Sequence, residues 1–231
     1  MEKLGTNYGG WILPKSTNLN ENSIVYSGGV GEDMSFDIKL VSKYNCNVLL
    51  IDPTLKAKIH FDEYKKYILD KEYKFKGNIQ PDYYYTIKDE KHNISKIKYL
   101  DIGIWNKKDT LKFYRQDNNK YVSQSLIDGM FGEHYDIIQV DSIKNIMKQN
   151  NHTNIDLLKL DIEGAENVVL ENMLDDKIHP KYLCIEFDLL IKNKDPNNTT
   201  RNIINRLLNS GYKILYNDNF NITFEYILKK N

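Results

Sequence analysis

Short apolar segments alternate along the chain with stretches whose apolar residues recur at helical spacing. Residues 33–44 show the helical pattern, with Met34, Ile38 and Val41 on one face. We predict strands at residues 24–27, 47–52, 96–101, 110–114, 137–140 and 182–188. Residues 155–166 predict a further strand that ends in acids and leads into a helix. Strands that alternate with helices are typical of an α/β protein with a mostly parallel sheet and helices on both faces.

The remaining segments complete one domain, residues 1–231. Residues 213–216 and 223–228 predict an antiparallel hairpin at one edge of the sheet. Residues 70–96 are rich in Lys and Tyr without a clean period, and we predict that they and residues 116–135 are surface insertions. A length of 231 residues fits a single core.

The charge balance argues against several kinds of partner. Lys and Arg number 32, as do Asp and Glu, so no net field attracts nucleic acid or an anionic membrane. No apolar run approaches the roughly 20 residues of a membrane span, and Cys46 and Cys184 form neither a metal pair nor a disulfide framework. We expect a cytoplasmic protein without nucleic-acid or membrane partners, and the sequence leaves its oligomeric state open.

A glycine-rich turn, residues 27–33, follows the first predicted strand. Its glycines let the backbone approach a ligand closely at the carboxyl end of the strand. A dinucleotide site requires a third small residue where Met34 stands, and positive potential where Glu32 and Asp33 stand. This disfavours a nicotinamide-dependent oxidoreductase. The two acids suit a ligand with a cationic end, such as the ammonium and sulfonium groups of S-adenosylmethionine.

Residues after the next two strands extend this candidate cofactor site. Asp52 follows the second strand, 21 residues beyond Gly31, where an acid in this class of sheet accepts hydrogen bonds from ribose hydroxyls. Trp105 follows the third strand and is placed to stack on an adenine. The expected cofactor-binding residues are Gly28, Gly29, Val30, Gly31, Asp33, Asp52, Gly103, Ile104 and Trp105.

Acidic residues gather at the ends of two later strands that we expect to be neighbours. They are Asp161, Glu163, Glu166, Glu186 and Asp188. Such a cluster is costly unless it binds a cation, shares a proton or accepts hydrogen bonds from a ligand. Glu166 differs from the others, because an acid in the first turn of a helix is favoured by the helix dipole alone.

The segment Leu-Lys-Leu-Asp-Ile-Glu-Gly-Ala-Glu at residues 158–166 resembles the hallmark of the FkbM-type S-adenosylmethionine-dependent methyltransferases. Other segments follow in the order of that family, namely the glycine turn, residues 51–54, 103–114, 125–126 and 185–187. The resemblance covers most of residues 23–190. It implies a Rossmann-like class I methyltransferase fold and S-adenosylmethionine as cofactor. Residues 5–11 are similar to a glycine-containing segment of some relatives, which implies that residues 1–22 form a flap over the cofactor.

The resemblance further implies an O-methyltransferase acting on a hydroxyl of a sugar, a glycan or a secondary metabolite. We expect Asp161, Glu163 and Glu186 to take the hydroxyl proton and to orient this small-molecule or glycan acceptor.

Three alternatives stay open. A divalent ion, Mg or Mn, held by Asp161, Glu186 and Asp188 would lower the pKa of the acceptor hydroxyl. His134 is another candidate base, because an imidazole titrates near neutrality. A non-catalytic nucleoside-binding scaffold domain would also keep the glycine turn.

Overall fold

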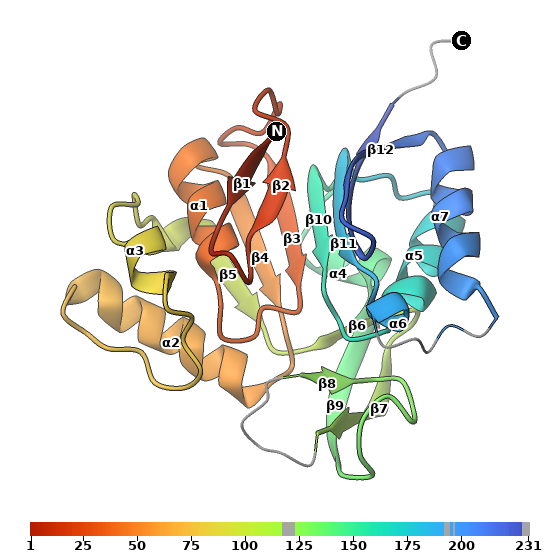
Figure 1. Ribbon diagram of the computed structural model, residues 1–231, viewed down its shortest axis with the longest axis horizontal. Coiled ribbons are helices and arrows are strands. Elements are labelled where there is room, and N and C mark those ends of the chain that lie inside the picture. Colours follow the sequence, from red (N-terminus) through yellow and green to blue (C-terminus); the bar gives the residue numbers. More distant parts are fainter. Residues whose placement is uncertain (117–122, 192–194, 196, 228–231) are drawn as a thin grey trace.

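The computed structural model describes residues 1–116, 123–191, 195 and 197–227, and its centre is a seven-stranded sheet in the order β12-β13-β11-β10-β3-β4-β5 (Figure 1). The strands are β3 (Ile24–Gly28), β4 (Asn47–Ile51), β5 (Ile97–Leu100), β10 (Leu157–Leu160), β11 (Tyr182–Glu186), β12 (Tyr212–Asn217) and β13 (Asn221–Tyr226). From β11 to β5 all neighbours are parallel, whereas β13 is antiparallel to both β11 and β12. The predicted hairpin therefore lies at the edge of the sheet, with β13 as the strand that runs in the opposite direction.

The strand order reverses between β3 and β10. The chain steps outward from β3 to β4 and β5, and later returns to place β10 on the other side of β3. In open α/β sheets a crevice forms at such a point, outside the carboxyl ends of the strands. The fold therefore places the turn after β3 beside the end of β10.

Helices cover both faces of this sheet, as the sequence predicts. One face packs against α1 (Ser35–Tyr44), α2 (Leu55–Leu69) and α3 (Tyr83–Ile87), and the other packs against α4 (Ile143–Gln149), α5 (Glu166–Asp175) and α7 (Thr199–Asn209). The short helix α6 (Asp188–Ile191) follows β11. The predicted α/β fold class is confirmed.

Side-chain caps determine where two of these helices begin. The Thr54 hydroxyl accepts a hydrogen bond from the Ala57 N–H at 3.2 Å, and the Ser142 hydroxyl accepts one from the Asn145 N–H at 3.3 Å. Helix α1 begins at Ser35, so Asp33 lies in the preceding turn rather than in the helix that we predicted from residue 33.

A second sheet, which the sequence does not predict as a separate unit, lies next to the carboxyl ends of the central strands (Figure 1). It has the order β6-β9-β7-β8 and consists of β6 (Gly103–Trp105), β7 (Asp109–Arg115), β8 (Gln124–Ser125) and β9 (Tyr135–Ser142). Residues 117–122 of the predicted 116–135 insertion lie outside the described residues, as does the last predicted strand residue, Leu228.

The prediction that residues 70–96 form an irregular surface insertion is wrong for their aromatic part. This segment contains α3, and the side chains of Phe75, Tyr83 and Ile87 are buried. The Tyr83 hydroxyl lies 2.7 Å from Nε2 of His60 on α2. Aromatic side chains bury large areas without a regular spacing, so periodicity alone does not reveal this part of the core.

The N-terminal residues also contribute to the core. Strands β1 (Glu2–Leu4) and β2 (Trp11–Leu13) form an antiparallel hairpin whose Leu4, Trp11 and Leu13 side chains are buried.

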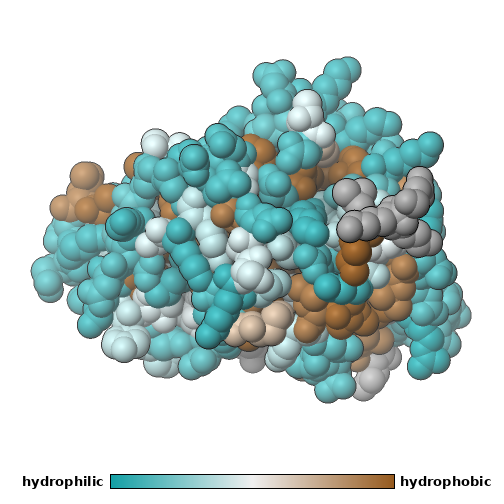
Figure 2. Space-filling view, turned by 90° about the horizontal axis from the view of Figure 1, so that it is seen from above, coloured by the Kyte–Doolittle hydropathy of each residue, from teal (hydrophilic) through white to brown (hydrophobic). Residues whose placement is uncertain are grey.

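The face of the molecule away from the second sheet is largely hydrophilic, with an apolar area towards the C-terminal half (Figure 2). None of the described helices is long and apolar enough to cross a membrane.

Replacing Leu13 tests whether the hairpin belongs to the core. The Leu13 side chain is fully buried, so Leu13→Ala should lower the free energy of unfolding by about 2–5 kcal/mol in chemical denaturation. Leu55→Ala, the same change at a side chain that is 74% exposed, should alter it by no more than about 0.5 kcal/mol. Equal effects of the two substitutions would show that the hairpin does not contribute to the core.

Candidate active site

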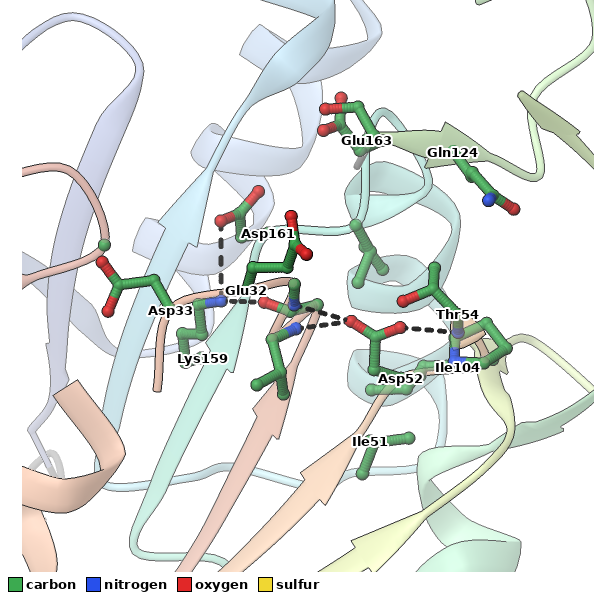
Figure 3. Close-up of a pocket in the computed structure, with 18 of the residues that line it drawn as sticks. Glu32, Asp33, Ile51, Asp52, Thr54, Ile104, Gln124, Lys159, Asp161 and Glu163 are labelled. Carbon is green, nitrogen blue, oxygen red and sulfur yellow. Dashed lines mark hydrogen bonds and ion pairs between the residues drawn. The ribbon is translucent and has the colours of Figure 1, made fainter. Parts of the chain in front are cut away.

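A cavity of about 290 Å³ lies at the carboxyl ends of β3, β4 and β10 (Figure 3). Its walls come from the turn after β3, residues 52–54 after β4, residues 161–163 after β10, the second sheet and the N-terminal segment. Of the expected cofactor-binding residues, Gly29, Val30, Gly31, Asp33, Asp52, Gly103 and Ile104 line it, as do the expected catalytic residues Asp161 and Glu163.

The glycine turn packs directly on the end of β10. Gly29 has a φ of +72°, and a Cβ atom there would lie 1.6 Å from the carbonyl oxygen of Asp161. This position therefore accepts only glycine. Gly28 does not line the cavity, and a Cβ atom on it would come within 2.7 Å of Ile104 Cδ1, so Gly28 allows the second sheet to pack closely.

Asp52 holds the turn in place. Its side chain is 3% exposed, and Oδ2 accepts hydrogen bonds from the N–H groups of Val30 at 2.7 Å and Gly31 at 2.9 Å. Oδ1 accepts a third from the Thr54 N–H at 2.8 Å (Figure 3). A carboxylate has about four acceptor positions, so one remains for a ligand hydroxyl.

Asp33 connects the N-terminal segment to the cavity. Its Oδ1 accepts a hydrogen bond from the Ser35 N–H at 2.9 Å, and its Oδ2 accepts one from the Thr6 hydroxyl at 2.5 Å. Thr6 in turn accepts a hydrogen bond from the Gly9 N–H at 2.9 Å. These bonds place Tyr8 and Gly9 in the cavity wall, where sequence reasoning had assigned no individual residue.

The acids after β10 and β11 create a strongly negative region. Tyr8 as a whole is 74% exposed, but desolvation of its hydroxyl at the cavity, followed by the carboxylates of Asp161 and Glu163, raises its pKa to about 12. Burial and the neighbouring Asp161 and Asp188 raise the pKa of Glu186 to about 9. Glu186 therefore holds a proton at neutral pH, which does not fit the base role expected for it.

Lys159 is a site residue that our sequence reasoning missed. It lies on β10 with 8% of its side chain exposed, and its Nζ donates a hydrogen bond to the Gly29 carbonyl oxygen. The same Nζ lies 3.5 Å from Oδ2 of Asp161. A lysine within an apolar strand was the available signal, because lysine is rarely buried without a partner.

Glu166 shapes the turn after β10. It accepts hydrogen bonds from the N–H groups of Ile162 at 2.8 Å and Gly164 at 3.0 Å, while Glu163 adopts a φ of +58°. Burial and the nearby Asp188 raise the pKa of Glu166 well above its ordinary value. The buried Glu166, next to Asp188, thus stabilises the backbone turn that forms this wall of the cavity.

Several predicted site residues lie elsewhere. Trp105 is half-buried on β6 and does not line the cavity, and Glu186 lies near Asp161 but outside the lining. His134 is exposed and does not line the cavity either. The described residues include no group of three or more His, Cys, Asp or Glu side chains arranged to hold a metal ion. Asp161, Glu186 and Asp188 therefore do not form the hypothesised Mg or Mn site, and we derive no step through a metal.

Residues 36–214, more than half of the chain, match the Methyltransferase FkbM domain. The chain belongs to the FkbM methyltransferase family. The resemblance seen in the sequence is thereby confirmed, and a methyltransferase that uses S-adenosylmethionine is the coarse functional assignment.

The other comparisons add little to the assignment of this chain as an FkbM methyltransferase. The crystal structure of Aeropyrum pernix fibrillarin in complex with natively bound S-adenosyl-L-methionine is similar, with a TM-score of 0.41 and 9% sequence identity over 93% of this chain and 70% of that chain. So distant a similarity carries no information on function. A comparison with curated proteins finds no match.

The raised pKa of Glu186 predicts a dependence of stability on pH. The folded state keeps a proton on Glu186 up to pH about 9, whereas the unfolded chain loses it near the ordinary value of 4.5. The native state therefore binds more protons in this window, and its stability falls as pH rises. The side chain of Glu186→Gln cannot ionise. The free energy of unfolding of this variant minus that of wild type should therefore increase between pH 5 and pH 9 in urea titrations.

The exposed Glu21→Gln variant is the matched control, and its difference from wild type should stay constant with pH. A constant difference for Glu186→Gln as well would show that Glu186 is ionised throughout.

Proposed function

We propose that the protein transfers the methyl group of S-adenosylmethionine to a hydroxyl oxygen of a sugar, a glycan or a secondary metabolite. One observation carries this proposal. The cavity at the strand-order reversal brings a glycine turn and Asp52 on one side together with Asp161 and Glu163 on the other. The first pair of features suits a nucleoside and the second suits a hydroxyl that must lose a proton.

The residues present fit S-adenosylmethionine. Gly29 forms a cradle that any side chain would fill, and Asp52 retains an acceptor position for a ribose hydroxyl. Ile51 and Ile104 give the cavity apolar wall area that suits a flat base. The acidic character of the other walls favours a cationic ligand. When bound, this cofactor supplies an electrophilic methyl carbon.

Asp161 is our candidate for the group that takes the acceptor proton. Its side chain is 34% exposed at the cavity, and its Oδ2 lies 3.5 Å from Nζ of Lys159. Glu163 lines the same wall. The amide side chains of Asn78, Gln80 and Gln124 also line the cavity, and amides both donate to and accept from hydroxyl groups. These groups support an acceptor with several hydroxyls.

Two measurements in sequence test the proposal. Calorimetry should show binding of S-adenosylmethionine and S-adenosylhomocysteine, and mass spectrometry of a sugar panel incubated with S-adenosylmethionine should show products heavier by one methylene unit. Cofactor binding without methylation of any hydroxyl compound would favour a nucleoside-binding scaffold domain. Tight binding of NADH in place of S-adenosylhomocysteine would overturn the cofactor assignment.

Asp52→Ala should weaken S-adenosylhomocysteine binding by about 1.5–3 kcal/mol in calorimetry, because it removes a charged acceptor and frees the backbone of the turn. Asp62→Ala, on the exposed side of α2, is the control and should bind as wild type does. An Asp52→Ala variant that is folded and binds with unchanged affinity would remove Asp52 from the site.

Asp161→Asn should abolish methyl transfer and leave S-adenosylhomocysteine affinity within about threefold of wild type, because the amide cannot accept the acceptor proton. Product formation by mass spectrometry and binding by calorimetry are measured on the same preparation. Transfer at the wild-type rate in this variant would defeat the assignment of Asp161 as the base.

A further inference from the structure

The Nζ atom of Lys159 brings a single positive charge to an acidic cavity. Five carboxylates line the described part of this cavity, those of Glu32, Asp33, Asp52, Asp161 and Glu163. Among the same lining residues Lys159 is the one Lys, Arg or His (Figure 3). Among the described lining residues, a negatively charged group that enters the cavity therefore finds a complementary charge only at Lys159.

The position of Lys159 on β10 places its ammonium group at the cavity wall. In the parallel register of β10, Lys159 lies beside Ser27 of β3 and Cys184 of β11, both fully buried, so the stem of the side chain passes through the core. Its end reaches the Gly29 carbonyl oxygen and approaches Asp161. Burying a lysine costs free energy unless its ammonium group is paired. An apolar residue would therefore pack at this position at a lower cost.

A purely structural role would pair Lys159 with the buried Asp37 of α1. Asp37 is 3% exposed, and its Oδ1 has no hydrogen-bond partner among the described residues. Burial raises the pKa of Asp37 to about 6 in spite of the opposing charge of Lys159. The Lys159 ammonium thus donates to the cavity wall rather than to the acid behind it.

We propose that Lys159 binds the carboxylate at the amino acid end of the cofactor. The proposal rests on S-adenosylmethionine being the cofactor. The Gly29 carbonyl oxygen, to which Lys159 now donates, would then accept a hydrogen bond from the ammonium group of the same amino acid. One donor replaces another at this oxygen, so no buried polar group is left unpaired. The flexible four-carbon stem of lysine permits the small movement that this exchange requires.

This arrangement fits an α-amino acid in particular. Its ammonium and carboxylate share one carbon atom, and the cavity wall offers a carbonyl acceptor and an ammonium donor in direct contact. The acids on the other walls repel a carboxylate, which leaves Lys159 as its partner. A nucleoside without the amino acid has no carboxylate that could pair with Lys159.

Three ligands separate the contributions in calorimetry. S-adenosylhomocysteine carries the ammonium and the carboxylate, its decarboxylated amine analogue carries the ammonium alone, and 5′-methylthioadenosine carries neither. Wild type should bind S-adenosylhomocysteine at least about tenfold more tightly than the amine analogue, the preference expected from a charge-assisted hydrogen bond. In Lys159→Met the preference should fall to less than about threefold, with the affinity for 5′-methylthioadenosine unchanged.

Two control variants sharpen the result. Lys159→Arg keeps the charge and should keep a preference for the carboxylate, while Lys39→Met removes an ion pair with Glu90 outside the cavity and should bind all three ligands as wild type does. Full carboxylate preference in folded Lys159→Met would overturn the proposal. Because the wild-type comparison needs no variant, equal affinities of wild type for S-adenosylhomocysteine and the amine analogue would also overturn it. Failure of wild type to bind any of the three ligands would instead overturn the cofactor assignment.

Discussion

The site depends on one carboxylate, that of Asp52, which accepts hydrogen bonds from three backbone N–H groups. Two of them belong to the glycine turn after β3 and the third belongs to Thr54 at the start of α2. The bonds hold the turn against the end of β10, where Gly29 leaves no room for a side chain above the Asp161 carbonyl group. The parallel sheet brings these strand ends together, and Asp52 fixes the shape of the cavity between them.

Electrostatics then assigns different tasks to residues of the same type. Asp161 contacts Lys159 and lines the cavity, whereas the half-buried Glu186 has a pKa raised to about 9 and retains its proton at neutral pH. Glu166, which is more deeply buried, supports the backbone of the turn after β10. Acidic residues that form a single cluster in the sequence are therefore divided by burial into a candidate base, a protonated carboxyl group and a structural group.

Most of the fold could be predicted from the sequence, because parallel strands covered on both faces appear as continuous apolar runs and the residues that follow them must meet at one edge. This reasoning was sufficient to bring Asp52, Asp161 and the glycine turn to one edge of the sheet, where they line the same cavity. It could not place Trp105, because the pairing of β6 with β9 in a second sheet depends on contacts between segments far apart in the chain. The buried aromatic residues of 70–96 and the proton on Glu186 depend on tertiary burial in the same way.

A crystal structure of the protein with S-adenosylhomocysteine tests the central claim most directly, namely that the cavity at the strand-order reversal is the cofactor site. We predict that the ligand lies between the glycine turn and the end of β10, with a ribose hydroxyl at Asp52 and its sulfur open towards Asp161. A ligand bound elsewhere, or bound in this cavity with its ribose away from Asp52, would contradict the account.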